Sequence, residues 1–284
     1  MFRTVTGIGA VFRHIPGDVP TLEQLQLPKV LVNFCDYHQG MVLVTGSTGT
    51  GKSTTLAAMI NHLNETRSLN IISLEDPIEF VHPSKRCQVI QRELDTHVRS
   101  FADGVRSAMR EDPDVILVGE LRDAETIMMA MTAAETGHLV FGTLHTTGAV
   151  KTIDRIIDAL PGELREQTKA FLSMSLKAVV TQVLVKTVDG RGRRAILEIL
   201  VNNRAIAKMI TSDQTHQIGS QLQTGVDQGM QLLDSALLTA IQKKEIDPDD
   251  AIRFANDKKK FQRFLTNTDQ VPMIDVGGNE VLTN

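Results

Sequence analysis

Cysteine is scarce and long apolar runs are missing from this sequence, and each shortage excludes a class of protein. The 284 residues include two cysteines, Cys35 and Cys87, too few for a disulfide framework or a four-cysteine zinc site. No apolar run approaches the roughly 20 residues that span a bilayer, and no secretory signal opens the chain. We therefore expect a cytoplasmic protein without direct membrane insertion.

A strong excess of charge is missing as well. The formal net charge is -4, so no general attraction to nucleic acid or to an anionic membrane is expected. Residues 258–260 form a short basic run, which is typical of a solvated helix face. With 42% apolar and 23% charged residues, the composition instead fits a globular protein with a full-sized core.

Short apolar segments alternate with helical patterns in the first half of the chain. This alternation predicts an α/β fold, in which a mainly parallel sheet is covered by helices on both faces. The expected strands are 41–45, 71–74, 114–118 and 139–144. The expected helices are 20–39, 52–63, 101–110 and 123–135.

The second half of the chain is expected to be mostly helical. Its glycine-containing turn at 189–192 predicts a hairpin between strands 183–188 and 194–200. The expected helices are 150–159, 163–180, 204–211, 229–243 and 248–256.

Residues 46–53 form a complete phosphate-binding loop. They match G-x-x-x-x-G-K-[ST] at every fixed position, between an expected strand and an expected helix, which makes a chance glycine-rich turn a weak alternative. Lys52 is expected to reach the β- and γ-phosphates of ATP and Ser53 to bind Mg²⁺. The residues expected to hold the nucleotide in this loop are Gly46, Ser47, Thr48, Gly49, Thr50, Gly51, Lys52, Ser53 and Thr54.

Carboxylates follow two of the expected strands. The segment 75–79 comes after the second strand, where an ordinary charged loop is an equally good interpretation. Glu120 closes the third strand, and Gly119 stands where most P-loop enzymes carry the Asp that binds Mg²⁺. An acid at the end of a buried apolar strand is costly without a partner, which favours a functional Glu120. In an open α/β sheet, ligands bind at these carboxyl ends of the strands.

Two histidines flank the fourth expected strand. His145 follows its carboxyl end, where it could donate a hydrogen bond to the γ-phosphate. His138 precedes the strand, and a structural role is the commoner one for a lone histidine.

The four motifs together resemble the secretion-type motor ATPases and, among them, the PilT/PilU family of type IV pilus retraction ATPases. The residues that carry the resemblance are GSTGTGKST (46–54), ISLEDPIEFVHP (72–83), REDPDVILVGELRD (110–123) and TGHLVFGTLHTT (136–147). They are similar to the family's Walker A motif, Asp box, Walker B motif and His box. The resemblance implies a RecA-like P-loop core.

The resemblance also implies roles for individual residues. Glu79 resembles the catalytic glutamate that polarises water, Glu120 the Walker B acid at Mg²⁺, and His138 and His145 the His-box pair. Family members are homohexamers that hydrolyse ATP and act on an inner-membrane pilus platform protein. An arginine from the N-terminal side completes their site, and Arg13 is the candidate here.

The expected domain organisation follows from the same resemblance. Residues 1–18 are similar to the end of a PAS-like N-terminal domain and its linker, and the abrupt start suggests a shortened chain. The RecA-like ATPase core is expected over 19–202, a helical C-terminal region over 203–266 and a flexible tail over 267–284.

Two departures from the family pattern keep alternatives open. The retraction ATPases carry A-I-R-N-L after the hairpin, where this chain has Ala205-Ile206-Ala207-Lys208-Met209. Together with the short N-terminal part, this leaves a nucleotide-binding regulatory subunit with weak hydrolysis as one alternative. An assembly ATPase of another secretion system is a second, which the missing zinc cysteines disfavour. A P-loop kinase is a third, and no arginine-rich lid segment supports it.

Overall fold

The computed structural model describes residues 2–11 and 17–265. Its strands are β1 (Phe2–Thr4), β2 (Gly7–Gly9), β3 (Gly40–Thr45), β4 (Asn70–Glu75), β5 (Gln88–Glu93), β6 (Val115–Val118), β7 (Leu139–Leu144), β8 (Leu176–Lys186) and β9 (Arg193–Val201). Its α-helices are α1 (Val30–Cys35), α2 (Lys52–Thr66), α3 (Phe101–Ala108), α4 (Ala124–Glu135), α5 (Ala149–Ala159), α6 (Arg165–Ser175), α7 (Arg204–Thr211), α8 (Ile218–Thr224), α9 (Leu233–Gln242) and α10 (Pro248–Ala251). Short 3-10 turns are η1 (Gly162–Leu164), η2 (Thr215–Gln217), η3 (Val226–Gln228) and η4 (Lys258–Phe264).

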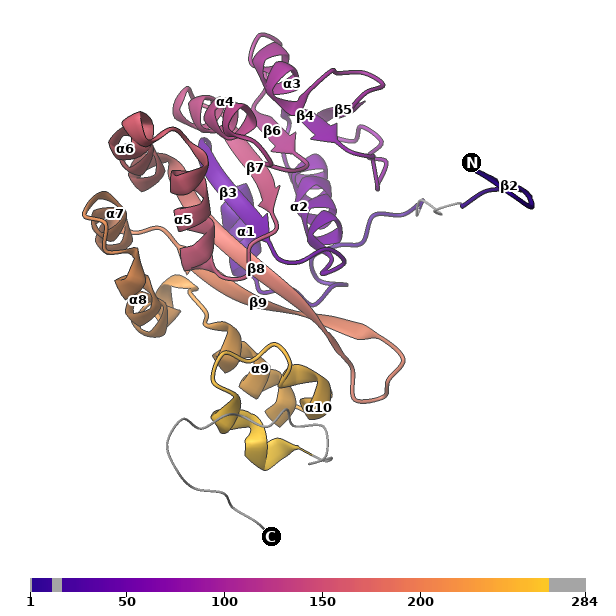
Figure 1. Ribbon diagram of the computed structural model, residues 1–284. Helices are drawn as coiled ribbons and strands as arrows, with labels where there is room; N and C mark the ends of the chain where they lie inside the picture. The colour runs from indigo at the N-terminus through magenta and orange to yellow at the C-terminus, as the bar shows by residue number, and fades with distance from the viewer. Residues whose placement is uncertain (1, 12–16, 266–284) are drawn as a thin grey trace.

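A seven-stranded sheet forms the centre of the molecule (Figure 1), in the order β5-β4-β6-β7-β3-β8-β9. The strands pair in parallel from β5 to β8, and β9 returns antiparallel to β8. The carboxyl ends of β3, β4, β6 and β7 therefore meet at one edge of the sheet. This arrangement confirms the predicted α/β class and places the loops that follow these strands side by side.

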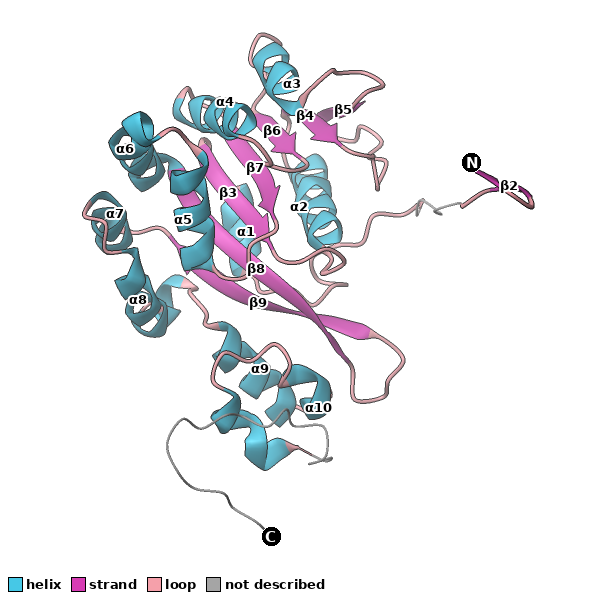
Figure 2. Ribbon diagram, in the orientation of Figure 1, coloured by secondary structure: helices cyan, strands magenta, loops and turns pink. Residues whose placement is uncertain are grey.

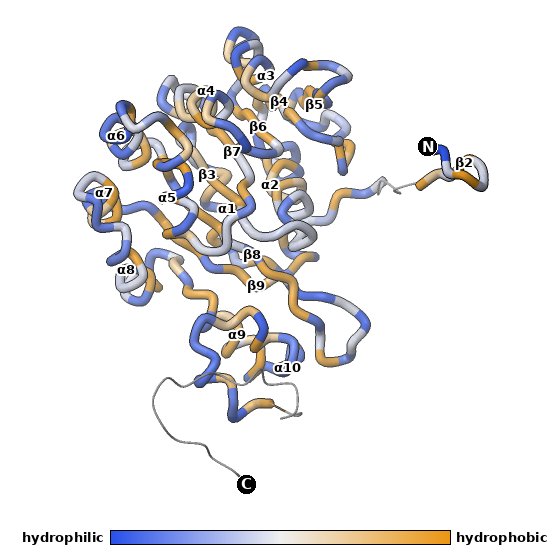
Figure 3. The backbone as a smooth tube through the Cα atoms, viewed as in Figure 1, coloured by the Kyte–Doolittle hydropathy of each residue, from blue (hydrophilic) through white to orange (hydrophobic). Residues whose placement is uncertain are grey.

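Helices cover both faces of the sheet, as Figure 2 shows. The apolar residues of α1 and α2 pack on one face, and those of α3 to α8 pack on the other. The central strands are buried along their whole length, and apolar residues gather on them (Figure 3). A separate small core, formed by α9, α10 and η4, packs against the outer part of β8 and β9.

The predicted helix over 20–39 is wrong for most of its length. Thr21 and Gln24 do form a reciprocal capping pair, in which Thr21 N donates to Gln24 Oε1 at 2.8 Å and Gln24 N donates to Thr21 Oγ1 at 3.2 Å. However, Gln26 has a φ of 53°, and Pro28 disfavours helical backbone at the residue before it. The segment 22–26 is therefore a set of turns, and the helix begins only at Val30.

Three other secondary-structure predictions need correction. The helix predicted over 163–180 ends at Ser175, where β8 begins and takes up the stretch 176–186. The helix predicted over 229–243 begins at Leu233, and that over 248–256 is the short α10. The edge strand β5 and the helix α8 were not predicted.

The predicted domain boundaries remain predictions. The boundary at 202 falls one residue after β9, and residues 2–9 form a small antiparallel hairpin. The tail predicted over 267–284 lies outside the described residues. Among the residues that are described, every helix is too short or too polar to span a membrane.

Candidate active site

The phosphate loop joins the end of β3 to the start of α2, and its backbone requires glycine. Gly46, Gly49 and Gly51 have φ values of 142°, 82° and 86°, which residues that carry a side chain rarely adopt. A Cβ on Gly46 would also lie 2.4 Å from the carbonyl oxygen of Gln182. The loop is thus held tightly against β8 and leaves the N-terminus of α2 open for an anion.

Lys52 lies under this loop with its side chain buried. Its Nζ donates to the carbonyl oxygens of Gly46 at 2.8 Å and Ser47 at 3.2 Å. Burial lowers the pKa of Lys52, and the charges of Glu120 and Glu79 act in the opposite direction. Both glutamates are therefore close enough to the ammonium group to influence its charge.

Gln182 in β8 supports the loop from behind. Its Nε2 donates to the Thr50 carbonyl oxygen at 2.6 Å, and its Oε1 accepts from Thr55 Oγ1 at 2.7 Å. The side chain is 1% exposed, so both bonds are shielded from water. One amide thus ties the loop and the first turn of α2 to the sheet.

Glu120 follows β6 and is held by two cationic or ionisable side chains. Its Oε1 lies 3.1 Å from His145 Nε2, and its Oε2 accepts from Arg122 Nε at 2.5 Å. Thr48 Oγ1 lies 3.5 Å from His145 Nδ1, on the other side of the imidazole ring. His145 therefore connects the phosphate loop to the acid at the end of β6.

Gly119 stands where many P-loop proteins carry an Asp, and the packing explains why. Its N–H donates to the Leu74 carbonyl oxygen at 2.7 Å, and a Cβ at this position would approach the same oxygen to 2.9 Å. Thr143 Oγ1 donates to the Gly119 carbonyl oxygen from β7. A side chain at 119 would thus push β4 and β6 apart, which leaves Glu120 as the acid of this strand end.

The acidic segment after β4 divides into structural and cavity-lining residues. Ser73 Oγ and Gln91 Nε2 donate to Glu75 Oε1 at 2.8 and 3.0 Å, while burial raises the pKa of Glu75. Asp76 lies 3.6 Å from Arg122. Glu79, at the end of the segment, is half-buried.

A cavity of about 600 Å³ brings the predicted residues together at the carboxyl edge of the sheet. The predicted members that line it are Thr48, Gly49, Gly51, Lys52, Ser53, Thr54, Glu79, Glu120 and His145. Residues that the sequence interpretation did not single out, among them His82, Arg122, Thr143 and Arg193, line it as well. His82 is buried, and burial lowers its pKa to about 4.

Four predicted site residues, Gly46, Ser47, Thr50 and His138, do not line this cavity. His138 precedes β7 and lies at the amino edge of the sheet, where its Nδ1 is 2.9 Å from the Ala133 carbonyl oxygen. Arg13 lies outside the described residues. Gln182, which sequence reasoning missed, could have been suspected as a glutamine inside an otherwise apolar strand.

The residues present suit a magnesium ion that is shared with a nucleotide. Ser53 and Glu120 both line the cavity and offer oxygen ligands. Within the described residues, no cluster of three or more His, Cys, Asp or Glu side chains could hold a metal alone. Mg²⁺ sites on nucleotides have this character, because phosphates and waters supply most of the ligands.

Comparison with known proteins agrees with this geometry. The family model of type II/IV secretion system proteins matches residues 22–267. This chain belongs to the type II/IV secretion system protein family. The finding confirms the family predicted from the four motifs.

Two members of this family are identical to the chain at half or more of the aligned positions. The twitching motility protein of Neisseria gonorrhoeae is 54% identical over 260 residues, a match that covers 92% of this chain and 70% of the relative. The type IV pilus retraction ATPase PilT of Pseudomonas aeruginosa is 50% identical over 260 residues, a match that covers 92% of this chain and 75% of that relative. The chain thus lies in the PilT branch of the family, as predicted.

Solved structures of family members have the same fold. A crystal structure of the pilus retraction motor PilT with bound ADP matches with a TM-score of 0.82 and 43% identity, covering 88% of this chain and 71% of that one. The ATPase DotB of Legionella pneumophila matches with a TM-score of 0.77 and 36% identity, and the match covers 84% of this chain and 66% of that one.

Proposed function

We propose that this chain is an ATP-hydrolysing motor that powers type IV pilus retraction. The observation that carries the proposal is a single cavity lined by Lys52, Glu79, Glu120 and His145, directly beside a complete phosphate loop. The half-identical relatives include a twitching motility protein and a pilus retraction ATPase, which supports the same conclusion.

The proposed reaction is the in-line attack of a water molecule on the γ-phosphorus of ATP. The bond between the γ-phosphorus and the bridging oxygen breaks, and ADP leaves with that oxygen. The loop amides hold the phosphates, and Lys52 exchanges its carbonyl partners for phosphate oxygens. Glu79 orients the attacking water and accepts its proton.

The remaining polar side chains act on the terminal phosphate. Ser53 and Glu120 would hold Mg²⁺, which supplies positive charge next to the β- and γ-phosphates when it is bound. His145, placed between Thr48 and Glu120, donates a hydrogen bond to the γ-phosphate. Its position changes with the phosphate, so it reports the state of the site to the end of β6.

The proposed assembly follows the family resemblance. The chain would act as a homohexamer at the inner face of the inner membrane and move a pilus platform protein. An arginine such as Arg13 would complete each site, because a guanidinium stabilises the charge that develops on the transferring phosphate.

Two substitutions test the assigned roles. Glu79→Gln keeps the shape of the side chain and removes its charge, so ADP binding should persist while hydrolysis falls about 10²- to 10⁴-fold. Lys52→Ala should lose both binding and hydrolysis. Steady-state phosphate release and calorimetric ADP binding measure the two effects. A Glu79→Gln variant with the parent's rate would refute the role of Glu79, and a parent that binds ADP without turnover would favour the regulatory-subunit alternative.

A further inference from the structure

A second cavity adjoins the nucleotide cavity along the β8–β9 ribbon. This outer cavity of about 1120 Å³ is lined by the hairpin, by the start of α2 and by residues 24–27. Four residues line both cavities and form their common wall: Gly51, Thr54, Leu184 and Arg193. A ligand that extends from the phosphate loop into the outer cavity must pass this wall.

The register of the ribbon explains why Arg193 stands at this wall. Alternate side chains of a strand share a face, so Leu184 lies on the same face of β8 as Gln182, which holds the phosphate loop. Leu184 pairs with Ala195 in β9, and its Cδ1 lies 3.6 Å from the Cβ position of Gly51. Arg193 is two residues from Ala195, on this same face, one step further out from the loop.

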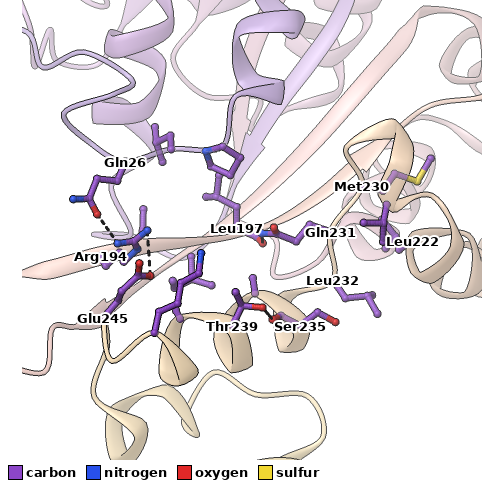
Figure 4. Close-up of a pocket in the computed structure, with 18 of the residues that line it drawn as sticks. Gln26, Arg194, Leu197, Leu222, Met230, Gln231, Leu232, Ser235, Thr239 and Glu245 are labelled. Atoms are coloured by element: carbon purple, nitrogen blue, oxygen red, sulfur yellow. Dashed lines mark hydrogen bonds and ion pairs between the residues drawn. The ribbon is translucent and has the colours of Figure 1, made fainter.

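The neighbouring Arg194 provides a contrast. Arg194 also lines the outer cavity, but it lies on the other face of β9, where it donates to Gln26 Oε1 and lies 3.3 Å from Glu245 Oε2 (Figure 4). Its positive charge is thus balanced by Glu245 within the fold. Arg193 is exposed, and its side chain makes no hydrogen bond or ion pair with the described residues. Its guanidinium remains available to a ligand in the cavities.

We infer that Arg193 binds the α-phosphate and ribose of the nucleotide, with the base lying in the outer cavity. The inference rests on the proposed function, because it needs ATP on the phosphate loop. Lys52 and the loop amides take the β- and γ-phosphates, so the nucleoside end must leave along Thr54, which lines both cavities. Arg193 lies on that path, and guanidinium groups bind phosphate oxygens through charge-assisted hydrogen bonds.

This role differs from that of an arginine acting on the transferring phosphate. The α-phosphate carries the same charge before, during and after hydrolysis, so Arg193 binds ATP, the transition state and ADP alike. Uniform binding of this kind changes KM and leaves kcat nearly constant.

The test compares Arg193→Ala with Arg193→Lys and with Arg194→Ala as the matched neighbour. Calorimetry measures the binding of ADP and of inorganic phosphate, which occupies the phosphate loop and lacks both the α-phosphate and the nucleoside. For Arg193→Ala we expect ADP affinity to fall about 10- to 100-fold, KM for ATP to rise in step, and kcat and the affinity for inorganic phosphate to stay within about 3-fold of the parent. Arg193→Lys should recover part of the ADP affinity, since the charge remains. Arg194→Ala should lower the melting temperature and keep the parent's ADP affinity.

Each contrary result has a distinct meaning. Parent-like ADP affinity in Arg193→Ala overturns the inference and leaves the proposed function standing. A fall in kcat without a change in ADP affinity also overturns it, because the residue would then act on the γ-phosphate. Equal losses of affinity for inorganic phosphate and for ADP would overturn it as well, because they would show a collapsed loop instead of a lost contact to the α-phosphate and ribose. Failure of the parent itself to bind ADP would reject the proposed function.

Discussion

The two ends of β7 each carry a histidine, and the surroundings of the two rings differ. His145, at the carboxyl end, contacts Thr48 of the phosphate loop and Glu120 of the β6 end. His138, at the amino end, contacts Ala133 and Thr136, both from the turn just before it. Polar groups at the carboxyl edge thus connect separate elements, whereas this one at the amino edge closes a local turn. The comparison indicates that a histidine's position along the strand decides whether its imidazole can contact a bound nucleotide.

The largest expected effect comes from a matched pair of glycine substitutions. Gly46 at the carboxyl edge and Gly137 at the amino edge both have positive φ, 142° and 111°, so Ala is strained at both by about 1 kcal/mol. A Cβ at 46 would also overlap the Gln182 carbonyl oxygen, whereas nothing lies within 4 Å of one at 137. Gly46→Ala should abolish ADP binding and cost more than about 2 kcal/mol of stability. Gly137→Ala should keep the parent's ADP affinity in calorimetry and lose only about 1 kcal/mol in urea unfolding.

The two histidines give the next comparison. His145→Ala removes a hydrogen-bond donor to the γ-phosphate and a partner of Glu120, so kcat should fall about 10- to 100-fold. His138→Ala should leave kcat within about 2-fold, because its ring contacts only its own turn in the described structure. Phosphate release under saturating ATP measures both. Equal losses in the two variants would break the comparison and give His138 the catalytic role that the His-box resemblance implies.

A smaller effect is expected at two amide side chains, Gln182 in β8 and Asn202 directly after β9. Gln182 holds the phosphate loop, whereas Asn202 Nδ2 donates to the carbonyl oxygens of Ser173 and Leu176 at the amino end of β8. Gln182→Leu should raise KM for ATP about 10-fold as the loop loosens, and Asn202→Leu should lower only the melting temperature. A Gln182→Glu variant keeps the acceptor for Thr55 and loses the donor to Thr50. Its KM for ATP should therefore lie between that of the parent and that of Gln182→Leu. Unchanged KM in both Gln182 variants would contradict a positioning role.

The last comparison concerns stability in acid and leaves activity at neutral pH unchanged. Burial lowers the pKa of His82 from 6.5 to about 4. Between these two pH values, His82 is therefore protonated in the unfolded chain and largely neutral in the folded one. Stability is therefore unaffected by this group above pH 6.5 and falls as the pH drops from 6.5 toward 4, by an amount on the order of 3 kcal/mol. His82→Gln should flatten this part of the pH profile in urea unfolding, whereas His138→Gln should keep the parent's slope. A His82→Gln profile as steep as the parent's would contradict this origin.

Much of the core was predictable because local pattern and tertiary environment agree there. The strands β3, β4, β6 and β7 are short apolar runs, and their burial on both faces matches that composition. The edge strand β5 reads Gln-Val-Ile-Gln-Arg-Glu, with no buried residue, so its sequence lacks the apolar run that identifies a central strand. The chain around Leu176 is apolar on either side of the change from α6 to β8, and periodicity alone does not separate the two states there.

The candidate site also has one part that the local sequence predicts and another part that it does not. The phosphate loop is one continuous segment whose spacing reflects a local requirement, and Glu120 and His145 follow from the rule that parallel strands end at a shared edge. Gln182 and Arg193 come from a strand far along the chain, and their roles depend on the register between β8 and β9 and on the pairing of β8 with β3. No local pattern encodes that register. His138 shows the reverse case, in which a motif member lies at the opposite edge of the sheet.

The length of β8 has a mechanical consequence. Gln182 fixes this strand to the phosphate loop, and Lys186 N, at its last residue, donates to Asp250 Oδ2 of α10 at 2.9 Å. The four residue-to-residue steps between these attachments span about 13 Å of extended backbone, and this stretch cannot shorten or fold without breaking the ladder to β9. β8 therefore connects the phosphate loop to α10 by one continuous stretch of paired backbone, so a displacement of the strand at Gln182 would also displace α10.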